Sequence, residues 1–337
     1  MKETSFQEFL EGIRNRRIPF NTVFELTSRC NLSCVHCYQS RGTRDGLTGA
    51  AVRSILEQLK EAGCLKLTFT GGEPTLRKDF QDIYREAHEM GFAVTLYTNG
   101  TLLGRETRSL LAARPPLAVE VSLYGAAPET HDRVTGKPGS FDAAVDNLRR
   151  MSEDGISVVV KTVVMTLNFQ EQGRLRRLTE GLGAPLRSTF RIFAPADRER
   201  SVDSLRLPAR DIRNLSSKQP PDALPEEEDE TEPQESFLCH AGSDSCCVGS
   251  DGDVFPCTVL RWRCGNLKTQ SFHEIWNTSP VLARWRAVTE RDYPSCLACA
   301  FRDRCRFCPG MGFMEHGNAL VPSQELCRIT KAMWSER

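Results

Sequence analysis

Three cysteines lie within eight residues near the start of the sequence, in the stretch CNLSCVHC. Three residues separate Cys30 from Cys34, and two separate Cys34 from Cys37. A closed zinc site takes four protein ligands, and a four-iron cluster normally takes four thiolates. His36 is the less favoured fourth ligand, because Cys34 and Cys37 flank it too closely for its ring to fold back onto the same ion. Three thiolates therefore predict a cluster with one iron open to a substrate or cofactor.

A second and larger group of cysteines lies in the last third of the chain. Of the 14 cysteines, ten fall between Cys239 and Cys327, and Cys64 stands alone as a candidate small buried residue. Tight groups of thiols in a reducing compartment indicate metal or cluster ligation before disulfides. Zinc sites of the ribbon type remain the competing interpretation of the second group, because paired CxxC motifs also bind zinc.

The composition argues against several kinds of partner. The formal net charge of the 337 residues is zero, so no general attraction to nucleic acid or to an acidic membrane is expected. No apolar run approaches the roughly 20 residues that span a bilayer. The N-terminal stretch mixes acids and bases and lacks the apolar core of a signal peptide. We therefore expect a cytoplasmic protein.

Strand and helix patterns alternate through the first two thirds of the sequence. We expect strands over residues 21–27, 65–70, 92–98, 117–123, 157–165 and 188–193, and helices over 49–63, 80–91, 105–114, 140–155, 171–183 and 209–217. Six β–α units in series predict an α/β fold, with a parallel sheet that is curved or closed as a barrel and helices outside it. Functional groups then gather after the carboxyl ends of the strands, where the first cysteine loop lies.

The alternation stops near Pro220, and four segments follow from the pattern. Residues 219–236 are rich in proline and acid and indicate a solvated linker, with an acidic surface for a basic partner as the alternative. An N-terminal segment covers 1–19 and the α/β part covers 20–218. A small cysteine-rich domain, held by ligation more than by a core, covers 237–337.

The stretch CNLSCVHC resembles the CxxxCxxC loop of the radical S-adenosylmethionine (radical SAM) enzymes. The resemblance covers about residues 20–193 and implies a partial (β/α)6 TIM-type barrel. It also implies a [4Fe-4S] cluster whose open iron is chelated by S-adenosylmethionine. In that family the reduced cluster cleaves the cofactor, and a 5′-deoxyadenosyl radical abstracts hydrogen from the substrate.

The stretch GGEP after the second strand resembles the GGE motif of the same family. Gly71 and Gly72 would let the backbone approach the cofactor, and Glu73 would accept a hydrogen bond from the cofactor's ammonium group. By the same resemblance, the cofactor-binding residues are Gly71, Gly72, Glu73, Pro74, Asn99, Ser122, Arg133 and Lys161.

The second cysteine group resembles the SPASM extension of radical enzymes that modify peptides. Its Gly-x4-Cys element matches Gly252 and Cys257, while Cys308 arrives one residue earlier than the pattern requires. The resemblance implies two auxiliary [4Fe-4S] clusters. The first would use Cys239, Cys246 or Cys247, Cys257 and Cys308, and the second Cys296, Cys299, Cys305 and Cys327. Members of the sulfatase-maturing branch carry an Asp where this sequence has Thr258. Because the proposed base of that reaction is absent, sulfatase maturation is a less favoured function.

Three hypotheses for the function are to be distinguished, of which the resemblance implies the first two. The first is a radical SAM/SPASM enzyme that installs a thioether or carbon–carbon crosslink, or a related oxidation, in a ribosomally made peptide. The second is a radical decarboxylase or oxidoreductase of haem or other cofactor biosynthesis. The third is a non-catalytic zinc-binding module. For the first, the partners would be a peptide or small protein, an electron donor such as flavodoxin or ferredoxin, and, unless the substrate is recognised directly, a separate leader-recognition protein.

Overall fold

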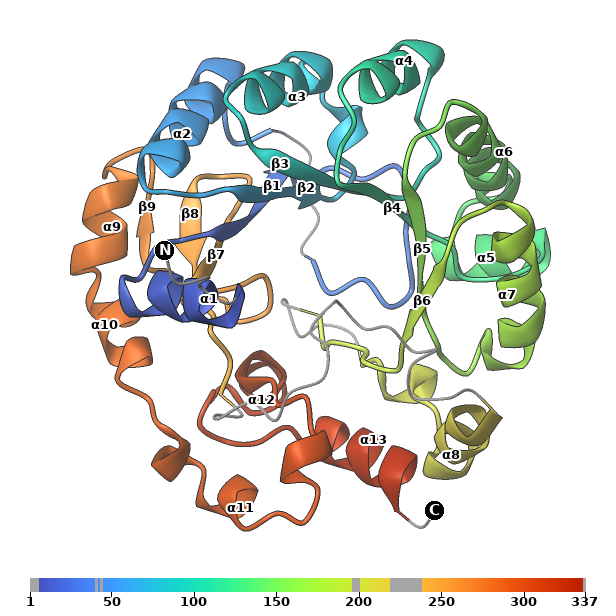
Figure 1. The fold of residues 1–337 in the computed structure, drawn as a ribbon. Coiled ribbons are helices and arrows are strands. Elements are labelled where there is room, and N and C mark those ends of the chain that lie inside the picture. Colours follow the sequence, from blue (N-terminus) through green and yellow to red (C-terminus); the bar gives the residue numbers. More distant parts are fainter. Residues whose placement is uncertain (1–5, 40–41, 43–44, 196–200, 219–237, 336–337) are drawn as a thin grey trace. The chain divides into compact units, whose positions relative to one another are not determined.

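A computed structural model describes residues 6–39, 42, 45–195, 201–218 and 238–335 (Figure 1). The chain forms two compact units, which interleave along the sequence. The first unit comprises residues 1–29, 41–97 and 240–288, and the second comprises 30–40, 98–239 and 289–337. The acidic linker predicted over 219–236 lies outside the described residues, and the four predicted segment boundaries stay predictions.

The first unit contains a six-stranded sheet in the order β3-β2-β1-β7-β8-β9. Its elements are α1 (Phe6–Asn15), β1 (Asn21–Thr27), α2 (Gly49–Glu61), β2 (Lys66–Gly71), η1 (Pro74–Leu76), α3 (Phe80–Glu89), β3 (Ala93–Thr98), β7 (Ser245–Val248), β8 (Asp253–Phe255), β9 (Gly265–Asn266), α9 (Phe272–Thr278) and α10 (Pro280–Arg286). β1 pairs in parallel with both β2 and β7, whereas β8 and β9 are antiparallel additions.

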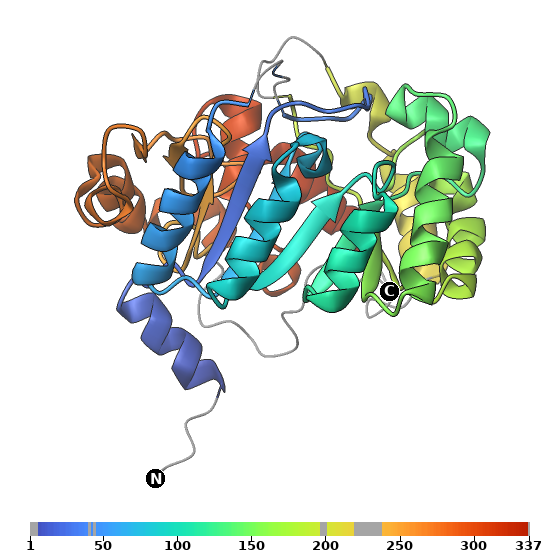
Figure 2. The ribbon, with the colours of Figure 1, turned by 90° about the horizontal axis from the view of Figure 1, so that it is seen from above.

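Helices cover one face of this sheet, to which every second side chain of a strand points. In β1, Phe24 and Leu26 are fully buried, and the side chains between them point to the opposite face. Helix α2 begins at an N-cap, Thr48, whose hydroxyl accepts from the Ala51 N–H. Its buried face carries apolar side chains at the spacing of an amphipathic helix. Figure 2 shows α2 and α3 lying along the same side of the strands.

The second unit contains three parallel strands in the order β6-β5-β4. Its elements are α4 (Arg105–Ala113), β4 (Ala118–Ser122), α5 (Pro128–Thr135), α6 (Ser140–Glu153), β5 (Val158–Val163), η2 (Phe169–Glu171), α7 (Gln172–Gly181), β6 (Leu186–Thr189), η3 (Asp203–Leu205), α8 (Ala209–Lys218), η5 (Glu290–Asp292), α11 (Pro294–Leu297), η6 (Arg302–Arg304), α12 (Pro309–His316) and α13 (Gln324–Trp334). None of the described helices combines the length and apolar character needed to cross a membrane.

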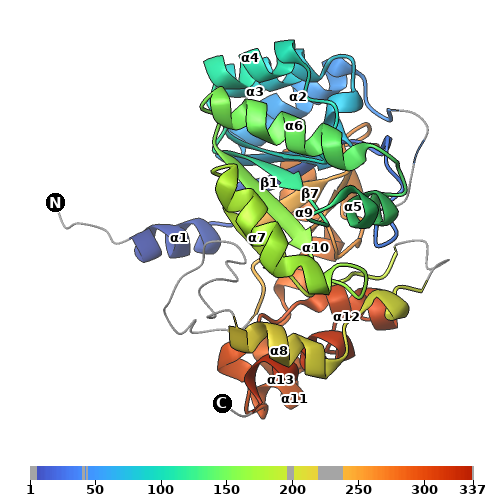
Figure 3. The same cartoon turned by 90° about the vertical axis from the view of Figure 1, so that its right-hand side faces the viewer.

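The sixth strand is shorter than the sequence pattern predicts and begins earlier. β6 ends at Thr189, and the chain then leaves the sheet. The apolar alternation beyond that point is real but serves packing, because Phe190 and Ile192 enter different clusters. Phe190 joins Ile212 of α8 and Ile329 of α13, two helices that lie side by side in Figure 3. Apolar residues at every second position therefore show only that those side chains are buried, which occurs in extended loops as well as in strands.

Candidate functional site

The first cysteine loop follows β1 and, within the second unit, is held by the end of α5. The backbone N–H groups of Ser33 and Val35 donate to the carbonyls of Thr135 and Val134 at 2.7 and 2.9 Å. Gly136, which ends α5 with φ +68°, brings the helix end close to the loop. Only glycine adopts this backbone conformation without strain. The loop that carries Cys30, Cys34 and Cys37 therefore has backbone anchors that do not depend on its thiols.

Asn99 lies beside the same loop. Its amide nitrogen donates to the side-chain oxygen of Asn31 at 2.8 Å and lies 4.0 Å from the Cys30 sulfur. The amide nitrogen of Asn31 in turn donates to the Thr101 hydroxyl at 2.9 Å, and Thr101 donates back to the Asn99 oxygen. This closed set of hydrogen bonds fixes the Asn99 amide next to the thiols. Asn31 and Thr101 were not predicted from the sequence, because polar residues in loops usually face water.

His36 and Tyr124 form a buried aromatic pair next to the thiols. The ring centroids lie 4.6 Å apart, edge to face. Burial lowers the pKa of His36 to about 4, so its ring is neutral. Its Nδ1 is buried and has no hydrogen-bond partner among the described residues. Burial raises the pKa of Tyr124, as do the neighbouring cysteine charges, and its hydroxyl is hydrogen-bonded by Ser122. Ser122 is thereby placed near the loop.

These groups fit an iron–sulfur cluster and a polar cofactor. The donor set is three thiols, each partly exposed, and the buried His36 nitrogen is a polar atom still to be satisfied. The Leu32 N–H points to the Cys30 sulfur at 3.5 Å, and hydrogen bonds to sulfur stabilise its thiolate form. Two predicted cofactor contacts fit less directly. Arg133 donates to the Leu167 carbonyl at 3.1 Å, and Lys161 forms an ion pair with Glu120.

The GGEP turn belongs to the first unit and shows why glycines are needed there. Gly71 has φ +133°, and a Cβ on Gly71 or Gly72 would collide with the backbone carbonyl of Thr27 or Arg29. The backbone N–H groups of Gly72 and Glu73 donate to those two carbonyls at 2.7 and 2.8 Å. The two glycines thus let two segments of this chain meet. Backbone approach to the cofactor stays a prediction.

Glu73 is fully buried and begins the η1 turn. Its Oε1 accepts from the Thr75 N–H at 3.2 Å and from the Thr75 hydroxyl at 2.6 Å. Pro74 follows at the first position of the turn, where its missing N–H costs nothing. The turn therefore fixes the Glu73 carboxylate in one orientation, and its contact with the cofactor's ammonium stays a prediction.

Replacing Glu73 with Gln should weaken S-adenosylmethionine binding about ten- to a hundredfold. Glutamine keeps an oxygen for Thr75 but removes the negative charge, and a hydrogen bond to a charged group contributes about 1.5–3 kcal/mol. Calorimetric titration of anaerobic protein measures the affinity. Glu57→Gln, a matched change on the exposed surface of α2, should bind as the wild type does. Equal affinities for both variants would remove Glu73 from the cofactor site.

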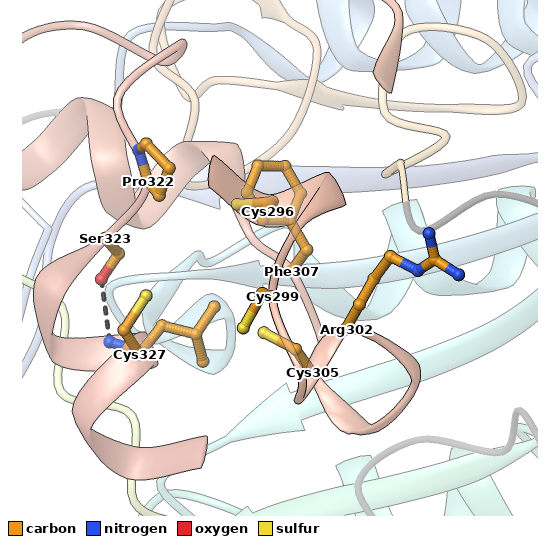
Figure 4. Close-up of a pocket in the computed structure, with 9 residues that line it drawn as sticks. Cys296, Cys299, Arg302, Cys305, Phe307, Pro322, Ser323 and Cys327 are labelled. Atoms are coloured by element: carbon orange, nitrogen blue, oxygen red, sulfur yellow. Dashed lines mark hydrogen bonds between the residues drawn. The ribbon is translucent and has the colours of Figure 1, made fainter. Parts of the chain in front are cut away.

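Four cysteines of the second group meet around one small pocket in the second unit. A cavity of about 40 Å³ is lined by Cys296, Cys299, Cys305 and Cys327, and Figure 4 shows their sulfur atoms around the same space. Burial raises the pKa of Cys305, and the Phe301 N–H points to the Cys299 sulfur at 3.4 Å. These are the four thiols that the sequence assigned to the second auxiliary cluster. Their ligation stays a proposal.

The described residues contain no group of three His, Cys, Asp or Glu side chains placed to hold a single metal ion. A tetrahedral zinc site would bring thiolate sulfurs within roughly 3.8 Å of each other, given Zn–S bonds of about 2.3 Å. A four-iron cluster binds its thiolates at separate corners and spaces them more widely.

The adjacent pair Cys246 and Cys247 points to opposite faces of β7. The Cys246 sulfur lies 3.5 Å from the Thr22 hydroxyl, to which the Cys64 thiol also donates. Burial raises the pKa of Cys246 to about 12. Cys247 lies instead on the side of Cys257, whose charge acts on it. Burial raises the pKa of Cys247 as well, so the choice between Cys246 and Cys247 as a ligand stays open.

The other proposed ligands of the first auxiliary cluster lie in both units. Cys257, in the first unit, accepts from the Leu260 N–H at 3.1 Å. In the second unit, Cys239 is exposed and lies near the Tyr293 ring, and Cys308 precedes α12. Burial raises the pKa of the Cys308 thiol.

The chain matches two protein-family models. Residues 24–178 match the radical SAM superfamily, and residues 239–300 match SPASM, an iron–sulfur cluster-binding domain. The first match contains the cysteine loop and all eight predicted cofactor-binding residues. The second contains Cys239, Cys257 and the CxxC pair Cys296 and Cys299.

Two kinds of curated relative resemble nearly the whole chain. Mycofactocin maturase MftC of Mycolicibacterium smegmatis is 32% identical over 314 residues, which cover 86% of this chain and 77% of the relative. AdoMet-dependent heme synthase of Methanosarcina barkeri is 29% identical over 332 residues, which cover 88% of this chain and 93% of the relative.

Solved structures show the same fold. SuiB of Streptococcus suis, bound to the precursor peptide SuiA, gives a TM-score of 0.73 at 17% identity and covers 95% of this chain and 79% of its own. Native anSMEcpe with bound AdoMet gives a TM-score of 0.73 at 17% identity, with coverage of 94% and 96%. The predicted α/β fold of the TIM-barrel type, with a cysteine-rich C-terminal region, is confirmed.

Proposed function

The chain belongs to the radical SAM superfamily and carries a SPASM domain, and we propose that it crosslinks or oxidises a ribosomally made peptide. The observation that carries this proposal is the 32% identity with mycofactocin maturase, a maturase by name, over 77% of that protein. The fold shared with a radical enzyme crystallised with its precursor peptide supports it. The crosslink, whether thioether or carbon–carbon, is the finer part of the proposal.

Family membership implies the cofactors, which are iron–sulfur clusters and S-adenosylmethionine. When bound at the first cluster, S-adenosylmethionine supplies a radical that removes hydrogen from an unactivated position. The protein's part is to bind, orient and exclude water. Cys30, Cys34 and Cys37 would hold three irons and leave the fourth open. The Asn99 amide, fixed beside Cys30 by Asn31, would orient groups at the open position.

The buried side chains around this loop would keep the site dry. His36 is neutral and packed against Tyr124, so neither ring brings a charge to the thiols. The Tyr124 backbone N–H donates to the Nδ1 of His131 at 3.1 Å, which fixes the end of β4 relative to α5. A rigid, water-poor site protects a reactive radical from side reactions.

The auxiliary cysteines would serve the second half of the reaction. Closing a crosslink after hydrogen abstraction leaves one surplus electron on the substrate, and a cluster held by these cysteines would supply an electron acceptor. The four thiols around one pocket in the second unit supply the donors for such a cluster. A flavodoxin or ferredoxin would reduce the first cluster, and a separate protein would supply leader recognition if the substrate carries a leader. Ligation of iron by thiolates needs reduced cysteines, which supports a cytoplasmic location.

Mass spectrometry of a precursor peptide encoded beside this protein, co-expressed with it, tests the proposal. We expect a product about two mass units lighter than the precursor, because crosslinking removes two hydrogens in total. Loss of carbon dioxide would overturn the crosslink in favour of decarboxylation. An unchanged mass with deuterium uptake from solvent would indicate epimerisation instead.

A second candidate function is a radical decarboxylase or related oxidoreductase that acts on a tetrapyrrole. The observation that favours it is the 29% identity with AdoMet-dependent heme synthase over 93% of that protein. Supply of an iron porphyrin carboxylic acid to the reduced enzyme, followed by measurement of released carbon dioxide, would distinguish this function from peptide modification.

A further inference from the structure

Thr330 lies inside α13 and carries a buried hydroxyl group. The residue is 5% exposed, and its hydroxyl donates a hydrogen bond to the Cys305 sulfur at 3.6 Å. Sulfur is larger than oxygen, so hydrogen bonds to it are longer. A buried polar group needs a hydrogen-bond partner, and among the described residues this hydroxyl has no second one. The side chain of Thr330 is therefore satisfied by a thiol.

Other threonines within the helices of this chain bond differently. A threonine hydroxyl in a helix commonly donates to a backbone carbonyl of the preceding turn. Thr179 of α7 donates to the Arg176 carbonyl at 3.0 Å, and Thr278 of α9 donates to the Glu274 carbonyl at 2.8 Å. Thr330 also lies in a helix interior, yet its hydroxyl proton is directed to a sulfur of another segment.

Cys305 is one of the four thiols around the pocket of the second unit (Figure 4). At Cys299, another of the four, the donor to the sulfur is the Phe301 backbone N–H, which any residue except proline would supply. At Cys305 the donor is a side chain, so its presence depends on the residue at position 330. This hydrogen bond can therefore be removed without a change in the backbone.

A hydrogen bond of this kind affects the reduction potential of a cluster. Reduction adds one negative charge, which the thiolate sulfurs share, so a donor stabilises the reduced form more than the oxidised form. Hydrogen bonds to the sulfurs are among the features that set the potentials of iron–sulfur clusters. Phe307, Pro322 and Leu326 line the same pocket, and in such apolar surroundings a hydrogen bond is electrostatically stronger than in water. The bond from Thr330 should raise the potential.

We propose that Thr330, acting through Cys305, raises the reduction potential of an iron–sulfur cluster held by the four thiols and makes it a better electron acceptor. The inference rests on the proposed function, in which this cluster takes the surplus electron. There the substrate loses a hydrogen atom to the 5′-deoxyadenosyl radical, then a proton to solvent and one electron to the cluster. An oxidised ferredoxin or flavodoxin takes that electron from the cluster before the next turnover.

Redox titration of the anaerobic, cluster-loaded enzyme, followed by electron paramagnetic resonance, tests this proposal. The signal that Cys327→Ala removes belongs to the cluster in this pocket. Thr330→Val keeps the branched shape but removes the donor. It should lower the equilibrium constant for reduction of that cluster about three- to tenfold, a fall of up to about 59 mV for one electron. Thr330→Ser keeps a hydroxyl and should retain the wild-type potential.

Thr179→Val is the matched control, because it removes a fully buried helical hydroxyl that bonds to a carbonyl. It should leave the potential unaltered. An unchanged potential in Thr330→Val, or an equal fall in Thr330→Ser, would overturn the inference. Loss of about four irons from both Thr330 variants would show a packing role and would also overturn it.

The same variants separate this inference from its premise. If Cys327→Ala removes no redox signal, the four thiols hold no redox-active cluster, and both the inference and the acceptor role fail. Thr330→Val should also yield less modified peptide per 5′-deoxyadenosine formed. A lower potential with an unchanged yield would confirm the effect of Thr330 on the cluster and overturn the acceptor role in the proposed function.

Discussion

Replacing Cys30, Cys34 and Cys37 together with alanine should abolish cleavage of S-adenosylmethionine while leaving about eight of about twelve irons per chain. The first cluster has no other ligands in this account, whereas the thiols of the second cysteine group stay in place. The loop itself should remain docked, because Ser33 and Val35 are held by backbone hydrogen bonds to α5. Chromatographic assay of 5′-deoxyadenosine and iron analysis of anaerobic protein measure the two effects.

Cys64→Ala is the matched control for this variant. Cys64 is buried and donates its thiol to the Thr22 hydroxyl, and no cluster in this account uses it. Its replacement should cost stability but keep both the iron content and the cleavage activity. Formation of 5′-deoxyadenosine by the triple variant, or loss of activity in the control alone, would contradict the assignment of the first cluster.

Replacing Cys327 with alanine should separate cofactor cleavage from product formation. Cys327 is one of the four thiols around the pocket of the second unit, so its loss should remove about four irons and leave the first cluster intact. The variant should still cleave S-adenosylmethionine when given a strong reductant. It should give no modified peptide, because electron removal from the substrate, or its binding, is lost.

Cys264→Ala supplies the comparison for this second variant. Cys264 is buried and donates to the Trp262 carbonyl at 3.3 Å, and it is not among the proposed ligands. It should retain iron and product. If Cys327→Ala yields modified peptide at the wild-type level, the auxiliary cluster has no part in the reaction.

Local patterns predicted most elements of the α/β part. The helix over 49–63 and the strand over 21–27 appear as α2 and β1, because apolar spacing and a capping threonine decide such elements locally. β7 was missed. Its four residues, which include Cys246 and Cys247, become a strand only because they pair with β1, more than 200 residues earlier. A pairing that distant leaves no periodic signal in so short a segment.

The candidate site also has features that were predicted from the sequence and features that were not. The ligand sets came from motif resemblance, and the gathering of Cys296, Cys299, Cys305 and Cys327 around one pocket agrees with the second set. The ion pair of Lys161 with Glu120 was not predicted, since it depends on the register of β4 and β5. The close approach of the GGEP glycines to another backbone segment could not be predicted from the sequence either. The backbone they approach is that of Thr27 and Arg29.

The proposed function requires that these cysteines hold iron–sulfur clusters in an enzyme and not zinc in a binding module. Iron, acid-labile sulfide and zinc per chain, measured on protein purified without oxygen, test this most directly. We expect about twelve irons with a matching amount of sulfide, from three four-iron clusters. Added S-adenosylmethionine should also alter the spectrum of one cluster. Stoichiometric zinc without sulfide would contradict the radical SAM function of these cysteines.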